Sequence, residues 1–256
     1  MRAQIFGYPI DILTMSETID LARTAMRRRT TTRHVALNVA KLVNMRTDPV
    51  LAEDVKNSDL IGIDGMGILL AARLLGLPAK ERVAGIDLLQ ELLAVCANES
   101  FRPFFLGATP GVVRKARATV TAKHPTIRFA GMHDGYFDAN REPQVVEEIR
   151  SSEADCLFIA MPTPRKERFL AAHRNRLGVP FIMGVGGSFD VLAGEVTRAP
   201  LLTQKLALEW LYRVYQEPRR MWWRYFKTNT IFAGMMLAAT VRGIRQKVNL
   251  KTSWPA

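Results

Sequence analysis

The chain of 256 residues has only two cysteines, Cys96 and Cys156, and each lies within a run of apolar residues. We therefore expect buried, reduced thiols and a protein made for a reducing compartment. No Cys/His spacing typical of a zinc module occurs, and the four histidines form no recognisable triad or metal-binding pattern. The sequence accordingly predicts neither a bound metal nor a cofactor.

Long hydrophobic runs are also missing. The apolar centre of the longest uncharged stretch near the C-terminus spans residues 231–241, which is 11 residues, whereas a membrane-spanning helix needs about 20. The N-terminal segment contains no apolar run typical of a secretory signal peptide. We expect no transmembrane helix and no signal peptide, while binding to a membrane surface stays open.

Positive charge is concentrated at the C-terminal end. The chain carries a net charge of +12, and residues 204–256 contain ten basic and only two acidic side chains. Such asymmetry indicates an anionic partner for this segment, which could be a membrane, a nucleic acid or a phosphorylated ligand. The alternative is a basic segment that is simply solvated.

Short apolar runs alternate with amphipathic stretches through the first 200 residues. We predict strands at residues 34–38, 60–64, 103–107, 127–132, 156–161 and 180–186, and helices at residues 67–76, 86–98, 111–123 and 145–152. This alternation is typical of an α/β fold, here a Rossmann-like, mainly parallel sheet flanked by helices. We predict a catalytic core over residues 1–200 and a helical appendage over residues 201–256.

Polar or glycine-containing turns follow most of the predicted strands. They include Asn38, Asp64–Gly65, Gly107–Thr109 and Gly184–Gly187. Because ligands of open α/β sheets bind at the carboxyl ends of the strands, these turns predict one common site. Asp64 is suited to general-base catalysis there, although an Asp before Gly is often only a turn residue.

Motifs that would specify the ligand are weak or absent. The strand–loop–helix segment at residues 107–116 offers free amides to a phosphate, but the glycine patterns of dinucleotide-binding and P-loop proteins do not occur. No Asp-x-Asp pair is available to hold a metal against a diphosphate. Arginines of the C-terminal segment would have to neutralise such a group instead.

The C-terminal segment predicts two helices. Leu206, Trp210 and Val214 have helical spacing, Glu209 and Arg213 are spaced to pair, and Pro218 is expected to end the first helix. Over residues 219–227 a helix would align a basic stripe with an aromatic one, which suits a lipid–water interface. These stripes comprise Arg220, Arg224 and Lys227, and Trp222, Tyr225 and Phe226. Alternatively, the tryptophans pack on the core and the arginines are solvated.

Seven segments together resemble one family. They are IGIDGMGILLAARLLG, ERVAGIDLLQELL, PFFLGATPGVVRKA, HDGYF, PTPRKERF, GVGGSFDVLAGEVTRAP and LALEWLYRVYQEPRRMWWRY. In this order, from about residue 5 to residue 245, the chain resembles the WecG/TagA/CpsF glycosyltransferases, also called glycosyltransferase family 26.

The resemblance implies an inverting, metal-independent hexosyltransferase. It would move a sugar from a UDP-sugar to a polyprenyl-diphosphate-linked acceptor during bacterial exopolysaccharide or other cell-surface polysaccharide synthesis. It would be cytoplasmic and peripheral on the inner face of the cytoplasmic membrane, with no nucleic-acid partner. The donor sugar, the acceptor glycan and the oligomeric state stay open.

The resemblance also implies roles for individual residues. Asp64 matches the proposed base, and the C-terminal appendage would close over the site and bring arginines to the diphosphate. The residues expected to bind substrate are Asn38, Gly65, Arg82, Asp87, Gly107, Thr109, Tyr136, Pro164, Lys166, Glu167, Gly186, Gly187, Arg213, Arg219, Arg220 and Arg224.

Two positions depart from the family pattern. Ala36 stands where the family has Thr in its T-x-N motif, and Lys166 replaces Gln in its P-K-Q-E motif. Both changes favour an exopolysaccharide role and a donor other than N-acetylmannosamine.

Two other function classes fit the composition. A nucleotide-dependent oxidoreductase on a Rossmann-like sheet would bind NAD(P), although its glycine fingerprint is absent. A non-enzymatic protein that binds membranes or nucleic acids through the basic segment would need no pocket in the first 200 residues.

Overall fold

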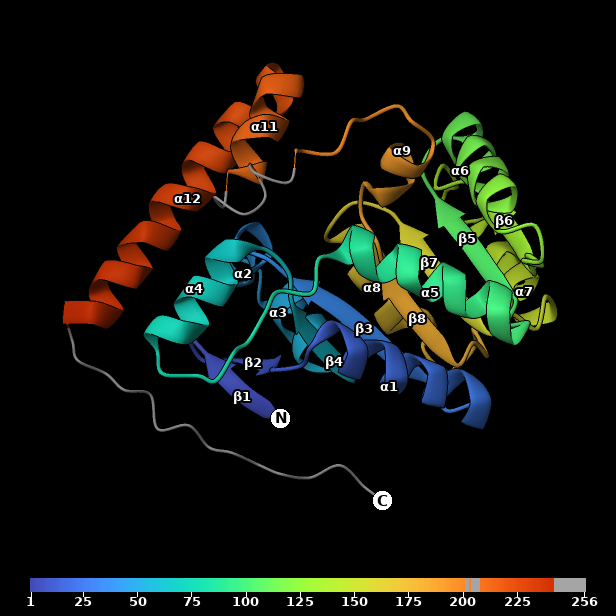
Figure 1. Cartoon of the computed structure of the whole chain (residues 1–256), viewed down its shortest axis with the longest axis horizontal. Coiled ribbons are helices and arrows are strands. Elements are labelled where there is room, and N and C mark those ends of the chain that lie inside the picture. The colour runs from blue at the N-terminus through green and yellow to red at the C-terminus, as the bar shows by residue number, and fades with distance from the viewer. Residues whose placement is uncertain (201–202, 204–207, 242–256) are drawn as a thin grey trace.

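The computed structural model describes residues 1–200, 203 and 208–241, and it contains one eight-stranded sheet with helices on both faces (Figure 1). The strand order is β1-β2-β4-β3-β8-β7-β5-β6. Strands β1 and β2 form an antiparallel hairpin, and every other pairing is parallel. The strands are β1 (Arg2–Ile5), β2 (Tyr8–Asp11), β3 (Thr32–Leu37), β4 (Leu60–Ile63), β5 (Pro103–Gly107), β6 (Gly131–His133), β7 (Cys156–Ala160) and β8 (Phe181–Gly184).

The helices connect the parallel strands and cover the sheet. They are α1 (Met15–Arg28), α2 (Val39–Met45), α3 (Pro49–Lys56), α4 (Met66–Leu74), α5 (Gly85–Glu99), α6 (Pro110–Lys123), α7 (Glu142–Ser151), α8 (Arg165–His173), α9 (Ser188–Leu192), α11 (Glu209–Gln216) and α12 (Pro218–Val241). The predicted α/β fold with a mainly parallel, helix-flanked sheet is therefore confirmed.

Alternate residues of the central strands serve two different hydrophobic cores. On β5, Phe105 packs with helices α1, α5, α6 and α9, whereas Phe104 and Leu106 face α7 and α8 on the other side. Strands buried on both faces need apolar residues at nearly every position, which explains the continuous apolar runs in the sequence. Cys96 and Cys156 lie in the first of these cores as buried free thiols, with their Sγ atoms 3.5 Å apart.

Most predicted elements agree with the structure, with one exception. The strand predicted at residues 127–132 is wrong over most of its length, because only residues 131–133 join the sheet. Ile127 instead packs in a hydrophobic core, and the Ala130 N–H donates to the carbonyl of Pro103 before β6 begins. The β1–β2 hairpin, whose strands have four residues each, was not predicted, and neither were helices α1, α2, α3, α8 and α9.

Helices α11 and α12, which we call the C-terminal arm, lie against one end of the sheet domain. Figure 1 shows α12 beside α2 and α4. Met235 is buried and Phe232 half-buried against the core, and the Phe232 ring makes an edge contact with Phe6 at a centroid distance of 6.2 Å. The break predicted at Pro218 is confirmed, since α11 ends at Gln216 and α12 begins at Pro218. Leu206 lies outside the described residues.

None of the helices within residues 1–200, 203 and 208–241 is long and apolar enough to cross a membrane.

Candidate active site

Asn38 and Asp64 lie at the carboxyl ends of neighbouring parallel strands. The Asp64 N–H donates to the carbonyl of Leu37 at 2.9 Å, which continues the pairing of β3 with β4 into the two turns. The Asn38 side chain caps α2 by accepting from the Lys41 N–H at 3.0 Å. Gly65 directly precedes α4 at φ +95°, a backbone conformation that glycine adopts without strain. The two predicted site turns are therefore adjacent.

Asp64 is partly buried and surrounded by charged groups. Burial raises the pKa of its carboxyl group, and the negative charge of Glu209 raises that pKa further. A hydrogen bond from the Gly85 N–H and the positive charges of Arg82 and Lys41 act in the opposite direction. A carboxylate with a raised pKa is a better base than a solvated one. The cations beside it can bind an anionic substrate.

Arg82 belongs to the same rim. The N–H of Val83 donates to the carbonyl of Ile63 at 2.8 Å, and this bond fixes the segment that carries Arg82 to the end of β4. The guanidinium Nη1 of Arg82 lies 2.8 Å from Oε2 of Glu209 on α11. The expected pairing of Glu209 with Arg213 is therefore wrong: the carboxylate turns toward the core and pairs across 127 residues of sequence. Glu209 is a member of the site that sequence reasoning missed.

Asp87 holds a second segment in place. Near the start of α5, its two carboxylate oxygens accept from Arg198, with Nη1 to Oδ1 at 2.5 Å and Nη2 to Oδ2 at 2.6 Å. This bidentate ion pair positions the segment that leads to the arm. Arg198 was not among the predicted site residues, although it lies within the GEVTRAP segment.

Lys41, Lys166 and Glu167 form a buried charge cluster. Oε1 of Glu167 lies 3.0 Å from the Lys41 Nζ and 2.9 Å from the Lys166 Nζ. Lys166 also donates to the Thr163 hydroxyl at 2.7 Å. The three charged side chains are 2–8% exposed, so two ammonium groups share one carboxylate away from water. Lys41 was not predicted; its only signal in the sequence is its place three residues after Asn38.

The proton affinities in this cluster reflect its charge balance. Burial lowers the pKa of Lys166 to about 8, with a further decrease from Lys41 and a smaller one from Arg224 of the arm. Although burial acts to raise it, the charges of Lys41 and Lys166 bring the pKa of Glu167 down to about 2. The cluster therefore carries one uncompensated positive charge at neutral pH.

The other predicted turns complete the edge of the sheet. Gly107 has φ +119°, and a Cβ at this position would lie 2.5 Å from the backbone of Ala160. Thr109 caps α6 by accepting from the Val112 N–H, and Gly187 directly precedes α9 after Gly186 at φ +54°.

The remaining predicted site residues are less closely tied to Asp64. Pro164 follows a cis peptide bond and precedes α8, and Tyr136 is 72% exposed. Roles in substrate binding for these residues and for the turns of β5 and β8 stay predictions.

The arm arginines differ in their placement. Arg213 is half-buried, Arg219 and Arg224 are exposed, and the side chain of Arg220 lies outside the described residues. Arg224 is near enough to the core to lower the pKa of Lys166. Of these arginines, Arg224 is therefore the one whose charge acts on the buried cluster.

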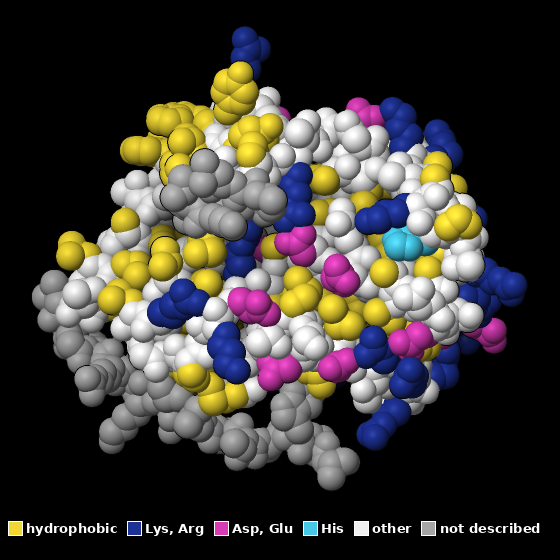
Figure 2. Space-filling model, viewed as in Figure 1, with side chains coloured by type: hydrophobic (Ala, Val, Ile, Leu, Met, Phe, Trp, Pro, Cys, Tyr) yellow, Lys and Arg dark blue, Asp and Glu magenta, His cyan; other side chains and the backbone are white. Residues whose placement is uncertain are grey.

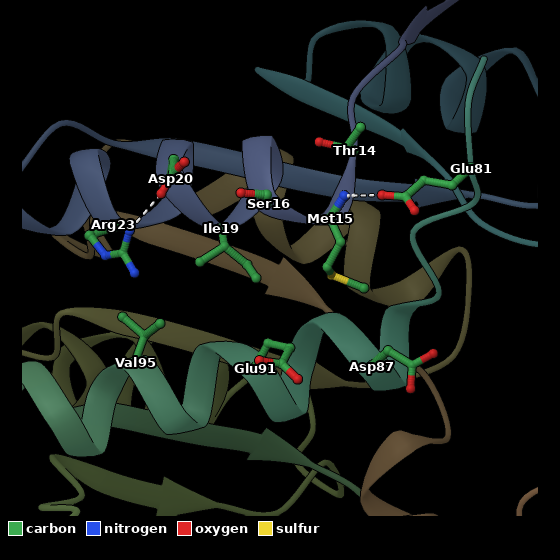
Figure 3. Close-up of a pocket in the computed structure, with 10 residues that line it drawn as sticks. All are labelled: Thr14, Met15, Ser16, Ile19, Asp20, Arg23, Glu81, Asp87, Glu91 and Val95. Atoms are coloured by element: carbon green, nitrogen blue, oxygen red, sulfur yellow. Dashed lines mark hydrogen bonds and ion pairs between the residues drawn. The ribbon is translucent and has the colours of Figure 1, made fainter.

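A cavity of about 680 Å³ lies between α1 and α5 (Figure 3). Met15, Ile19 and Val95 line it, together with the four carboxylates of Asp20, Glu81, Asp87 and Glu91 and the single guanidinium of Arg23. Apart from Asp87 it shares no residue with the predicted site. The acidic lining does not suit an anionic ligand, so the cavity is distinct from the site around Asp64.

A carboxylate of raised pKa and several cations lie at the carboxyl edge of an α/β sheet, an arrangement suited to an enzyme that acts on an anionic substrate. Among residues 1–200, 203 and 208–241, no group of three His, Cys, Asp or Glu side chains could hold a metal ion.

Comparison with known proteins identifies the enzyme class. The model of the glycosyl transferase WecG/TagA/CpsF family matches residues 3–246. An N-acetylglucosaminyldiphosphoundecaprenol N-acetyl-beta-D-mannosaminyltransferase of Staphylococcus aureus (strain MW2) is 32% identical over 86% of this chain and 87% of its own. The enzyme of the same name from Bacillus spizizenii strain W23 is 36% identical over 71% of this chain and 67% of its own.

The chain belongs to the WecG/TagA/CpsF glycosyltransferase family, as its motifs suggested. This membership favours the transferase over the oxidoreductase and the non-enzymatic alternatives. Among solved structures, a substrate-binding periplasmic protein from Ralstonia solanacearum matches 72% of this chain and 53% of its own, with 15% identity and a TM-score of 0.32.

Proposed function

We propose that this glycosyltransferase moves a sugar from a UDP-sugar to a polyprenyl-diphosphate-linked acceptor, with inversion and without a metal. The two relatives are named for transfer to a diphosphoundecaprenol-linked sugar, which supports an acceptor of this kind. The observation that carries the proposal is the setting of Asp64, whose pKa responds both to the core cations Arg82 and Lys41 and to Glu209 of the arm.

In this mechanism Asp64 accepts the proton of the attacking acceptor hydroxyl, and the bond between the sugar and UDP breaks as the new glycosidic bond forms. Negative charge then develops on the departing diphosphate. Arg82, and arm arginines such as Arg224, supply positive charge there in place of a metal ion. Asn38 and Gly65, at the same rim, have backbone and side-chain groups suited to contacting the donor.

The C-terminal arm, which belongs to the appendage predicted over residues 201–256, is the part that meets the membrane. Figure 2 shows hydrophobic side chains gathered over α11 and the beginning of α12. Trp222, Trp223 and Phe226 are exposed there, and the Phe226 ring stacks on both tryptophans at centroid distances of 5.9 and 6.0 Å. Exposed arginines and Lys227 on the same helix would add about 1 kcal/mol each on an anionic surface. These features support peripheral attachment to the cytoplasmic leaflet, where a lipid-linked acceptor lies.

One detail of the predicted aromatic stripe differs. Tyr225 does not share the exposed face: it is half-buried, with its ring 6.1 Å from that of Trp210. Trp223 is exposed instead. The surface offered to lipid is therefore the stack of Trp222, Trp223 and Phe226.

The test is sugar transfer by the full chain, with a panel of UDP-sugars and a polyprenyl-diphosphate-linked acceptor in lipid vesicles. We expect turnover with one class of donor, in the presence of a metal chelator, and its loss in Asp64→Asn. Asp138→Asn is the matched control, since Asp138 is exposed and only caps the turn at Asn140 and Arg141. Near-normal turnover by Asp64→Asn would rule out Asp64 as the base.

A further inference from the structure

The ion pair between Arg82 and Glu209 fastens the arm over the predicted site. Arg82 is 15% exposed and Glu209 is 23% exposed, so water screens this pair less than a surface pair. Farther along the arm, α12 is held independently by Phe232 and Met235, which pack on the core. Helix α11 can therefore lose its contact with Arg82 without releasing α12.

The guanidinium of Arg82 binds the same kind of atom whether its partner is a carboxylate or a phosphate. Both groups present negatively charged oxygens to N–H donors, with similar bond lengths and directions. With Glu209 in place, a second carboxylate also faces Asp64, alongside Arg82, Lys41 and the Gly85 N–H. A diphosphate approaching this rim meets an occupied arginine and two negative charges.

We propose that Glu209 occupies the oxyanion-binding position on Arg82 in the ligand-free protein and is displaced by the diphosphate of the nucleotide. This inference rests on the proposed function, because the competing ligand is the leaving group of the donor. Binding of the nucleotide releases the beginning of α11 from Arg82 and removes the charge of Glu209 from the neighbourhood of Asp64. Glu209 is thus a positioning residue that links the state of the arm to the occupation of the site.

If Glu209 and the diphosphate compete for Arg82, weakening the Arg82–Glu209 ion pair should tighten nucleotide binding. The test measures the Kd of UDP, by calorimetry, for the full chain and for Glu209→Gln, Glu209→Asp and Glu99→Gln. The first variant removes the charge, and the second keeps the charge but shortens the side chain so that it no longer reaches Arg82. Glu99 is the matched control: it is also 23% exposed and is paired with arginines, Arg23 and Arg27, but it ends α5, about 20 Å along that helix from the site.

We expect UDP to bind about three- to tenfold more tightly to both Glu209 variants and unchanged to Glu99→Gln. Inorganic pyrophosphate should show the same gain, and uridine, which has no phosphate, should show none. Unchanged or weaker binding of UDP to Glu209→Gln would overturn the inference. Binding of UDP to Glu209→Asp with wild-type affinity would also overturn it. The negative charge at position 209, and not its contact with Arg82, would then determine the affinity for UDP. If the wild-type chain binds no UDP, the proposed function itself fails, and the inference about Glu209 fails with it.

Discussion

The ammonium group of Lys41 lies 3.0 Å from a carboxylate oxygen of Glu167, and both side chains are almost fully buried. The Lys166 ammonium shares this same oxygen. One carboxylate therefore holds two cations away from water, and the stability of the folded chain depends on it.

We expect Glu167→Gln to lower the free energy of unfolding by about 3–5 kcal/mol, because it leaves two buried ammonium groups without a counterion. Chemical denaturation measures this loss. Glu147→Gln, which breaks an exposed i,i+3 pair with Arg150, should leave the free energy of unfolding nearly unchanged. Because the pKa of Glu167 is lowered to about 2, its contribution is complete above pH of about 4.5 and is lost as the pH falls toward 2. Equal losses in the two variants would contradict this account.

Lys166→Gln restores the residue typical of the family and removes the uncompensated charge. The folded-state pKa of Lys166, about 8, lies below the ordinary 10.5, so the wild-type chain gains stability from this group as the pH rises between these values. We expect the variant to be more stable at pH 7 by about 1–3 kcal/mol, with the advantage shrinking toward pH 10.5. Denaturation of both proteins across this range measures the difference. An advantage that does not change with pH would refute the assignment of the low pKa.

Asp64→Asn should separate activity from stability. Loss of a general base lowers turnover by about 10²–10⁴-fold. The pKa of Asp64 is raised in the fold, so its ionisation destabilises the wild-type chain as the pH rises above the ordinary range of an Asp. We expect the variant to be more stable at pH 7, as measured by denaturation. A less stable variant would show that the carboxylate holds the rim together.

Gly107→Ala tests the close approach of β5 to β7. The added Cβ would lie 2.5 Å from backbone atoms of Ala160, and φ is +119°. We expect a loss of about 2 kcal/mol or more in the free energy of unfolding. Gly111→Ala, in α6 with open space around its Cβ, should instead be neutral or stabilising by up to about 1 kcal/mol. Similar effects at the two glycines would argue against the clash.

Replacing both Trp222 and Trp223 by Ala should weaken binding to anionic vesicles at least about tenfold, because two exposed aromatic rings no longer enter the interface. Co-sedimentation with vesicles measures this, and Val50→Ala, an exposed apolar residue on α3, is the control. Transfer to a soluble acceptor analogue should persist. Unchanged vesicle binding would indicate that another surface meets the lipid.

Much of the fold could be predicted because the parallel strands are buried on both faces. Residues 103–107 form an unbroken apolar run, and β5 has these same bounds. The hairpin of β1 and β2 could not be predicted from the sequence, because each strand has only four residues and the hairpin lies at the edge of the sheet. Ile127 and Phe129 resemble strand residues, yet they are apolar because they pack under α6, not because they pair.

The site was predictable where a single strand end determines it. Asn38 and Asp64 follow apolar runs, and the pairing of β3 with β4 makes them neighbours. Glu209 and Arg198 could not be found in this way, because their partners, Arg82 and Asp87, are more than a hundred residues away. At helical spacing from Glu209, Arg213 was the nearer candidate, and only tertiary structure shows that the carboxylate faces inward.

The packing of Phe232 and Met235 on the core has a practical consequence for anyone shortening this protein. Removing the arm would uncover the Phe6 ring, which contacts Phe232, and the part of α2 that lies against α12, and would leave an apolar patch exposed to solvent. A shortened chain would then aggregate or bind detergent for reasons unrelated to sugar transfer. Single substitutions within an intact polypeptide are accordingly the sounder means of dissecting the arm.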